Sequence, residues 1–214
     1  MGTPQTEYAK IIRWYPQQTV YGVRMNVTLP TAASIGGRYG NGFVNFYLAG
    51  LGVEAGLSAD GPNAANKQFH WFCNGGSGSN GQYNFAAGST HSIELSMSGT
   101  LINFKVDGEV KRTITQSSKS VSKTLNDARV IVAACDQNYP STPPKPLDPW
   151  STTMNQVVCS NVQYRNAAGN WVTFSTQPDA TAYFPALPNY PHVGTPQDFV
   201  RVVSSGQLIA SLKK

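Results

Sequence analysis

The sequence carries little charge, and acidic side chains are the scarcest. Of its 214 residues 16 are Lys or Arg and 11 are Asp or Glu, so charged residues make up only 13%. Solubility therefore rests on uncharged polar side chains, and the 20 Gly and 14 Pro add turns and loops. Few segments repeat apolar residues at the three- and four-residue spacing of a helix. The composition thus predicts an all-β protein with long loops.

The basic excess is small and dispersed. The formal net charge is +5, and the chain has no arginine-rich run and no zinc-finger spacing of Cys and His. These absences argue against a nucleic-acid partner. A mildly positive surface would still attract an anionic polymer such as an acidic polysaccharide.

Long apolar runs are also missing. No segment approaches the roughly 20 apolar residues that span a bilayer, and the first seven residues, MGTPQTE, lack the basic and apolar regions of a signal peptide. We expect no membrane span. The low charge and the abundance of Asn, Ser, Thr and Gly favour the mature form of a secreted or extracellular protein, with a cytoplasmic protein as the alternative.

Cysteine is rare and follows no metal-binding spacing. The chain has only Cys73, Cys135 and Cys159. An odd number favours small buried apolar residues over a framework of disulfides, and a Cys135–Cys159 disulfide is the less favoured alternative.

Histidine is equally sparse, at positions 70, 91 and 192, with no carboxylate at ligand spacing. No metal site, structural calcium site or cofactor is indicated. His91 falls on the apolar side of its segment, which favours a core or strand-end role. No Gly-x-Ser-x-Gly motif supports a serine nucleophile, although a Ser/His/Asp triad assembled by the fold stays open.

Alternation of apolar and polar residues predicts several strands, of which residues 19–29 form the clearest. There Tyr21, Val23, Met25, Val27 and Leu29 share one face. The opposite, polar face carries Arg24 and Asn26.

Three further strands are expected at residues 43–48, 51–57 and 67–74. Their polar faces present Asn45 and Tyr47, then Glu54, then Gln68 and His70. In the last strand Phe69, Trp71 and Cys73 alternate with these polar residues and are assigned to the core.

The second half of the sequence indicates a meander. Residues 101–106 and 109–115 flank Asp107-Gly108, a dipeptide that favours the positive φ angles of a tight hairpin turn. Residues 155–165 and 171–174 predict a second hairpin, and the apolar run 129–135 predicts a central strand. The proline-rich ranges 136–151 and 178–198 are expected to be surface loops of a single domain, residues 1–214.

Residues 88–110, GSTHSIELSMSGTLINFKVDGEV, resemble the central meander of concanavalin A-like lectin/glucanase domains, and the later NVQY at 161–164 resembles a closing strand of that family. The resemblance implies an antiparallel jelly-roll β-sandwich of two packed sheets. It leaves function open, because the fold serves lectins, laminin-type modules, glycosidases, lyases and peptidases.

The enzymatic branches of that family make different demands on the sequence. Its retaining glucanases carry Glu-x-Asp-x-x-Glu on one strand, a spacing that this sequence lacks, so a glycoside hydrolase is disfavoured. The alginate-lyase-like branch implies a catalytic set of Gln68, His70, Arg24 and Tyr164. The early strand lacks that branch's Arg-x-Glu-x-Arg pattern, and the segment after Tyr164 also departs from it.

If the four polar strand faces lie side by side in one sheet, they form a groove suited to a sugar. Its ligand-binding set is Arg24, Asn26, Asn45, Tyr47, Glu54, Gln68 and His70, with Trp150 as a stacking platform; Trp14 and Trp171 are assigned to the core. The predicted partner is a polysaccharide or glycan, and catalysis is the less favoured outcome. The alternatives are a lyase for acidic polymers, a laminin-type protein-interaction module, and an ordinary solvent-facing sheet surface. The oligomeric state stays open.

Overall fold

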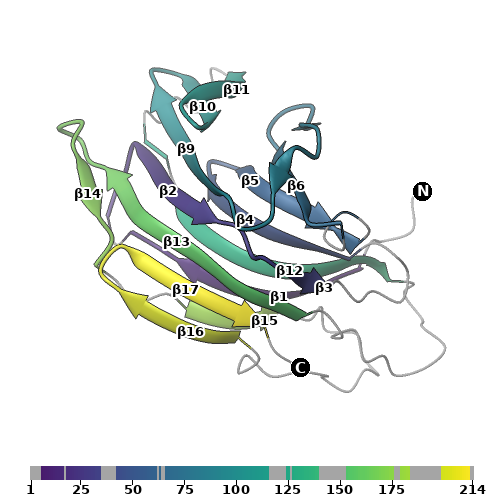
Figure 1. Cartoon of the computed structure of the whole chain (residues 1–214). Helices are drawn as coiled ribbons and strands as arrows, with labels where there is room; N and C mark the ends of the chain where they lie inside the picture. Colours follow the sequence, from purple (N-terminus) through teal and green to yellow (C-terminus); the bar gives the residue numbers. More distant parts are fainter. Residues whose placement is uncertain are drawn as a thin grey trace.

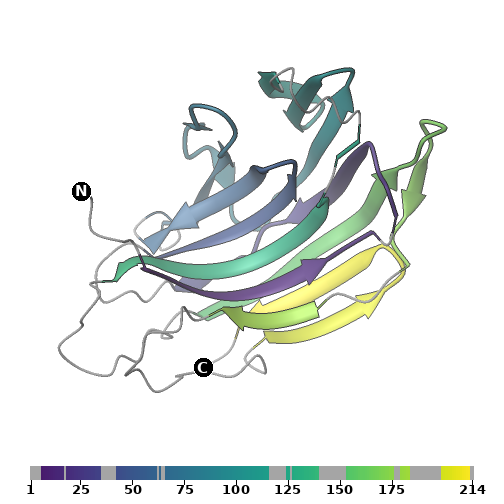
Figure 2. The same ribbon diagram turned by 180° about the vertical axis from the view of Figure 1, so that it is seen from behind.

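The computed structural model confirms an all-β sandwich of two antiparallel sheets (Figures 1 and 2). It describes residues 6–16, 18–34, 42–61, 63, 66–115, 124–125, 127–139, 153–175, 179–183 and 199–212. Among these residues, no helix is long and apolar enough to cross a membrane.

Sheet A has the strand order β15-β1-β12-β4-β5-β6-β7, with β8 paired to β6. Its strands are β1 (Thr6–Trp14), β4 (Gly42–Gly50), β5 (Val53–Asp60), β6 (Gln68–Cys73), β7 (Ser79–Asn80), β8 (Phe85–Ala86), β12 (Arg129–Tyr139) and β15 (Asp179–Tyr183).

Sheet B has the order β11-β10-β9-β2-β13-β17-β16, with β3 and β14 paired to β13. Its strands are β2 (Gly22–Thr28), β3 (Ala33–Ser34), β9 (Thr90–Ser98), β10 (Leu101–Val106), β11 (Glu109–Thr115), β13 (Thr153–Arg165), β14 (Trp171–Thr173), β16 (Phe199–Ser204) and β17 (Gln207–Leu212). In Figure 1 sheet B lies in front of sheet A, and Figure 2 shows the reverse view.

The core fills the space between the sheets, to which the strands of both sheets turn alternate apolar residues, and a smaller apolar cluster lies on the outer face of sheet A. Val23, Met25 and Val27 of β2 are at most 1% exposed, whereas Arg24 and Asn26 between them are half-buried. Facing strands contribute Phe46 and further aliphatic and aromatic side chains. Burial of this apolar surface is the main stabilising contribution to the sandwich.

Both predicted hairpins are present. Val106 pairs with Glu109 across Asp107 and Gly108, whose φ angles are 51° and 81°, as a tight two-residue turn requires. In the second hairpin β13 and β14 pair from Gln163–Thr173 to Arg165–Trp171.

The proline-rich ranges differ in part from the prediction. Strand β12 continues to Tyr139 and pairs with β1, and residues 179–183 form edge strand β15, which also pairs with β1. An edge strand tolerates nearby prolines because only one side of its backbone pairs within the sheet. Residues 140–152, which include Trp150, lie outside the described residues.

Cysteine behaves as a small buried apolar residue. Cys73 and Cys159 are both buried free thiols, so the alternative Cys135–Cys159 disulfide is wrong. Burial raises the pKa of the Cys159 thiol to about 12, which leaves it protonated at neutral pH.

Candidate functional site

The predicted groove residues are divided between the two sheets. Arg24 and Asn26 lie on β2 of sheet B, whereas the other five lie in sheet A, on β4, β5 and β6. A single groove made of all seven is therefore wrong. Strand pairing caused the error: β2 pairs with β9 and β13, strands distant in sequence, and not with β4.

The predicted lyase set is also dispersed. Gln68 and His70 lie on β6 of sheet A, and Arg24 lies on the outer face of sheet B. Tyr164 is paired with Val23, packs against the core and meets the Phe174 ring edge-on at 5.8 Å. The structure therefore does not assemble these four residues into one catalytic site.

On the outer face of sheet A, the predicted polar surface is largely buried. Tyr47 is 8% exposed and His70 7%, and Tyr47 belongs to an apolar cluster with Ile11, Ala49, Phe72, Ile131 and Ala133. Asn45 accepts a 2.5 Å hydrogen bond from Ser58 Oγ. Gln68 is exposed, and Glu54 forms a 3.7 Å ion pair with Arg129.

His70 sits beside a polar cluster at the edge of this face. Its ring centroid lies 4.3 Å from that of Tyr83, whose hydroxyl donates to Asp60 Oδ2 at 3.0 Å. Asp60 Oδ1 accepts from the backbone N and from Nδ2 of Asn63. Both carboxylate oxygens of Asp60 accept hydrogen bonds from residues of this cluster, so we assign the cluster a structural role.

Burial sets the protonation of these groups. It lowers the pKa of His70, although Asp60 and the Ser58 backbone oppose the effect. For Asp60 burial raises the pKa, but the hydrogen bonds from Asn63 and Tyr83 outweigh it and the net shift is downward. Burial and the bond to Asp60 raise the pKa of Tyr83 to about 12.

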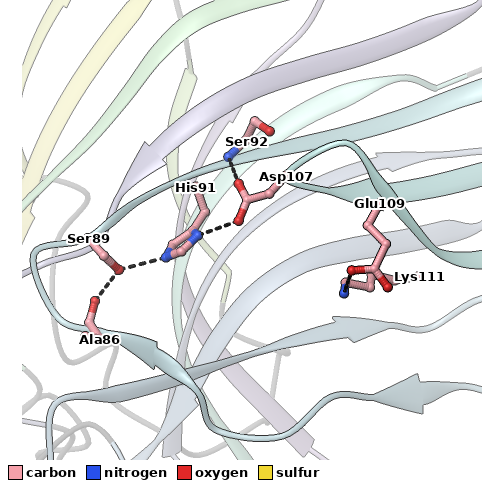
Figure 3. Close-up of polar contacts among 7 residues, drawn as sticks. All are labelled: Ala86, Ser89, His91, Ser92, Asp107, Glu109 and Lys111. Atoms are coloured by element: carbon pink, nitrogen blue, oxygen red, sulfur yellow. Dashed lines mark hydrogen bonds and ion pairs between the residues drawn. The ribbon is translucent and has the colours of Figure 1, made fainter.

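A second histidine cluster has the distances of a serine triad (Figure 3). Nδ1 of His91 lies 2.7 Å from Asp107 Oδ2, and Nε2 lies 2.7 Å from Ser89 Oγ. The Ser89 hydroxyl, however, donates its single proton to the Ala86 carbonyl at 2.5 Å, so the oxygen meets His91 as an acceptor.

This cluster also lacks the donors that acyl transfer needs. The backbone N–H groups of Ala87, Gly88 and Ser89 all donate to carbonyl groups, which leaves none of the three for an oxyanion. Asp107 Oδ1 accepts from Ser92 N at 2.8 Å. The cluster therefore fastens the Asp107–Gly108 turn to β9, in agreement with the strand-end role expected for His91.

A polar groove lies on the outer face of sheet B. It has a volume of about 440 Å³ and is called here the sheet B groove. Its lining residues come from β2, β9, β10, the turn after β10, and β13: Arg24, Met25, Asn26, Ser92, Ile93, Glu94, Lys105, Gly108, Asn161 and Gln163.

Across this groove four side chains form a row in direct register, here called the polar row: Gln163, Arg24, Glu94 and Lys105. Residues paired in this way hold their Cβ atoms about 5 Å apart. The row is linked at both ends, by Arg24 Nε donating to Gln163 Oε1 at 2.8 Å and by Lys105 Nζ donating to Glu94 Oε1 at 3.1 Å. Ser96 Oγ also donates to Glu94, at 2.7 Å.

Trp171 lies beside the row, against Arg24. The guanidinium carbon of Arg24 lies 4.2 Å from the centroid of the Trp171 ring, a cation–π contact. The ring lies over Gly22, where a Cβ would stand 3.2 Å from it. Trp171 is therefore on the outer face of sheet B, and its assignment to the core is wrong, whereas Trp14 is fully buried as expected.

A bulge aims Asn161 into the groove. The pairing of β13 with β2 shifts between Ser160 and Gln163, and Asn161 has a φ of 50°. Bulges turn a side chain away from its regular direction and are common beside functional sites. Asn tolerates this left-handed conformation better than most residues.

Of the groove residues, Arg24 and Asn26 were predicted from the sequence as ligand-binding residues, whereas Asn161, Gln163, Glu94 and Lys105 were not. Glu94 and Lys105 fall on the polar faces of strands that alternation identifies, so that signal was available. Alternation does not give the order of the strands in the sheet, so it could not show that these residues lie beside Arg24. No group of three or more His, Cys, Asp or Glu within the described ranges is placed to hold a metal ion.

No family model matches the sequence, and no curated protein matches it. Among solved structures, scytalido-glutamic peptidase with a transition state analog inhibitor aligns over 97% of this chain and 98% of its own, at 10% identity and a TM-score of 0.58. A laminarinase from Flavobacterium sp. UMI-01 aligns over 64% of this chain and 69% of its own, at 11% identity and a TM-score of 0.40.

A marine PL7 alginate lyase from Zobellia galactanivorans is similar over 59% of this chain and 54% of its own, at 11% identity and a TM-score of 0.38. The two lower scores are too distant to support an argument about activity. The likeness to the peptidase covers nearly the whole of both chains at very low identity, and it therefore shows a shared fold alone.

Proposed function

We propose that this protein recognises a carbohydrate and that the sheet B groove is its binding site. The proposal rests on several polar groups that line one groove and that still have donors or acceptors free to bind a ligand. Within the described part of the chain, no side-chain partner is present for the amides of Asn26 and Asn161, the Gln163 Nε2 group or the terminal nitrogens of Arg24.

These groups match the chemistry of a sugar. Planar amides offer a donor and an acceptor side by side, which suits the vicinal hydroxyls of a pyranose. A groove of about 440 Å³ falls within the range of small-ligand sites and has room for a short oligosaccharide segment. The Trp171 ring beside Arg24 offers an aromatic surface next to the groove for the C–H face of a sugar.

Recognition is favoured over cleavage. Glu94 is the one carboxylate that lines the described groove, and Lys105 and Ser96 hold its Oε1 atom. Glycoside hydrolysis usually needs two carboxyl groups flanking the scissile bond. The groove therefore offers hydrogen bonding and one charge pair, without an acid and base at working distance.

The test is a glycan-binding panel with matched amide substitutions. Asn26→Ala removes an amide from the groove, and Gln68→Ala removes an exposed amide from the opposite sheet. We expect Asn26→Ala to weaken binding about tenfold, since one well-placed hydrogen bond contributes about 1 to 1.5 kcal/mol. Gln68→Ala should leave affinity unchanged. A panel without any bound glycan would reject the proposal and favour a protein-interaction module.

A further inference from the structure

The charge arrangement in the sheet B groove specifies the class of sugar. The polar row holds two cations and one carboxylate. Glu94 is engaged by Lys105, with side-chain exposures of 21% and 32% for the two residues. Arg24 faces Glu94 in register but forms no ion pair with it or with any other described carboxylate. One positive charge in the groove therefore has no counter-charge among the described residues.

Arg24 is also held in a fixed orientation. Its Nε–H donates to Gln163, and its guanidinium lies against the Trp171 ring. These contacts leave the edge formed by the two terminal nitrogens. That edge presents two parallel N–H groups, the arrangement that binds both oxygens of a carboxylate. Because the side chain is already ordered, binding costs less conformational entropy than it would for a free arginine.

We propose, resting on the proposed function, that the sheet B groove selects acidic glycans and that Arg24 binds the carboxylate of a hexuronate residue. The amides of Asn26 and Asn161 contact the hydroxyls of the same or the adjoining sugar. Sulfate esters share the anionic chemistry, but the two-nitrogen edge matches a planar carboxylate most directly.

The experiment compares sugars that differ only in charge. The full chain is titrated calorimetrically with oligomers of galacturonate, mannuronate and glucuronate, with the methyl ester of each, and with a sulfated galactan oligomer. At least one uronate should bind tenfold or more tightly than its own ester, and raising the salt concentration should narrow this difference.

Variants assign the preference to Arg24. Arg24→Gln should abolish the preference for the acid over the ester. Arg24→Lys keeps the positive charge but lacks the two parallel N–H groups of the guanidinium, and it should retain only part of the preference. Arg201→Gln removes the same charge from edge strand β16 and should leave the preference intact. Glu94→Gln should strengthen binding of the acid. Circular dichroism verifies that each variant is folded.

The outcomes separate the two proposals. Equal binding of acids and esters by the wild type, or an acid preference that survives Arg24→Gln, overturns the inference and leaves carbohydrate recognition standing. Tighter binding of the sulfated oligomer than of any uronate overturns the assignment to a carboxylate. Absence of binding to every oligomer overturns the inference, and carbohydrate recognition is overturned with it only if the glycan panel also shows no binding.

Discussion

Asn161 is the residue at which β13 departs most clearly from a regular strand. Its φ of 50° and its place in the bulge aim its amide at the sheet B groove. A left-handed conformation is strained for a residue with a Cβ, by about 1 kcal/mol or more. Because Asn161 also lines the groove, we infer that its strained conformation is retained because it places the amide for binding.

Two substitutions at Asn161 separate strain from binding. Asn161→Gly should keep or slightly raise the free energy of unfolding, because glycine adopts positive φ freely, whereas Asn161→Ala should lower it by about 1 kcal/mol. Both remove the amide and should weaken glycan binding to a similar extent. Denaturant unfolding and calorimetric titration measure the two effects. Full affinity in the glycine variant would show that the amide does not contact the ligand.

His70 predicts a pH dependence of stability. Burial lowers its pKa in the folded state below the ordinary value of 6.5. As the pH falls below 6.5, the unfolded chain takes up a proton that the folded chain binds less readily, so the free energy of unfolding should fall. The stabilisation is complete above pH 6.5 and is lost as the pH falls through the lowered pKa.

The matched variant is His70→Phe, which keeps a ring beside Tyr83 but cannot titrate. Its free energy of unfolding should change less than that of the wild type between pH 6.5 and the onset of carboxylate protonation. Urea unfolding at a series of pH values measures the difference. Parallel pH profiles for the two proteins would show that His70 is not the group responsible.

At the scale of elements, alternation alone predicted strand β2 and the faces of its residues. Val23, Met25 and Val27 are buried and Arg24 and Asn26 face outward, because a strand turns successive side chains to opposite sides. The Asp107–Gly108 turn was equally predictable, since its φ angles are a property of two adjacent residues. Both features depend on residues that are adjacent in the sequence, and they can therefore be predicted without knowing the order of the strands.

The candidate site depended on contacts that are not local. Arg24 is bonded to Gln163, which lies 139 positions later in the sequence, through the pairing of β2 with β13. Alternation gives the face of each strand but not its neighbours in the sheet. For that reason Asn45 and Gln68 were grouped with Arg24, although they belong to the other sheet.

The contact between β2 and the β13–β14 hairpin gives a prediction about Gly22. A Cβ there would lie 2.9 Å from Ser96 Cβ and 3.2 Å from the Trp171 ring. Gly22→Ala should therefore displace the ring, lower the free energy of unfolding by about 1 kcal/mol and weaken glycan binding.

A double-mutant cycle with Trp171→Ala tests this route. If Gly22→Ala acts by moving the ring, its effect on binding should largely disappear once the ring is absent. Calorimetric titration of the wild type, both single variants and the double variant supplies the four affinities. Additive effects would indicate that Gly22 acts on the groove by another route.

At the scale of the whole molecule, the two-sheet sandwich was predictable from composition, alternation and the central meander. Low charge and abundant Gly and Pro disfavoured helices, and the strands required two sheets to bury their apolar faces. The run 129–135, apolar on both faces, indicated a covered central strand, but the burial of Tyr47 and His70 on the outer face of sheet A was not predictable from their own segments. Tyr47 packs in an apolar cluster with Ile131 and Ala133 of β12, a neighbour in the sheet that alternation does not identify.

The fold shared with scytalido-glutamic peptidase gives a further prediction. Glu54 of sheet A and Glu94 of the groove form ion pairs with Arg129 and Lys105. We therefore expect no cleavage of casein between pH 2 and 8, measured by release of acid-soluble peptides, with a commercial acid peptidase as the positive control. Cleavage that is lost in Glu54→Gln or Glu94→Gln would contradict a binding role.

Glycan binding in the sheet B groove is tested by residue-resolved nuclear magnetic resonance of the labelled chain during titration with the tightest-binding glycan. Shifts should concentrate on β2, β9 and β13 and include the side-chain amides of Asn26, Asn161 and Gln163. The amides of Asn45 and Gln68 on sheet A should stay unchanged. Shifts confined to the outer face of β4, β5 and β6, with the sheet B groove unaffected, would show that the glycan does not bind in the sheet B groove.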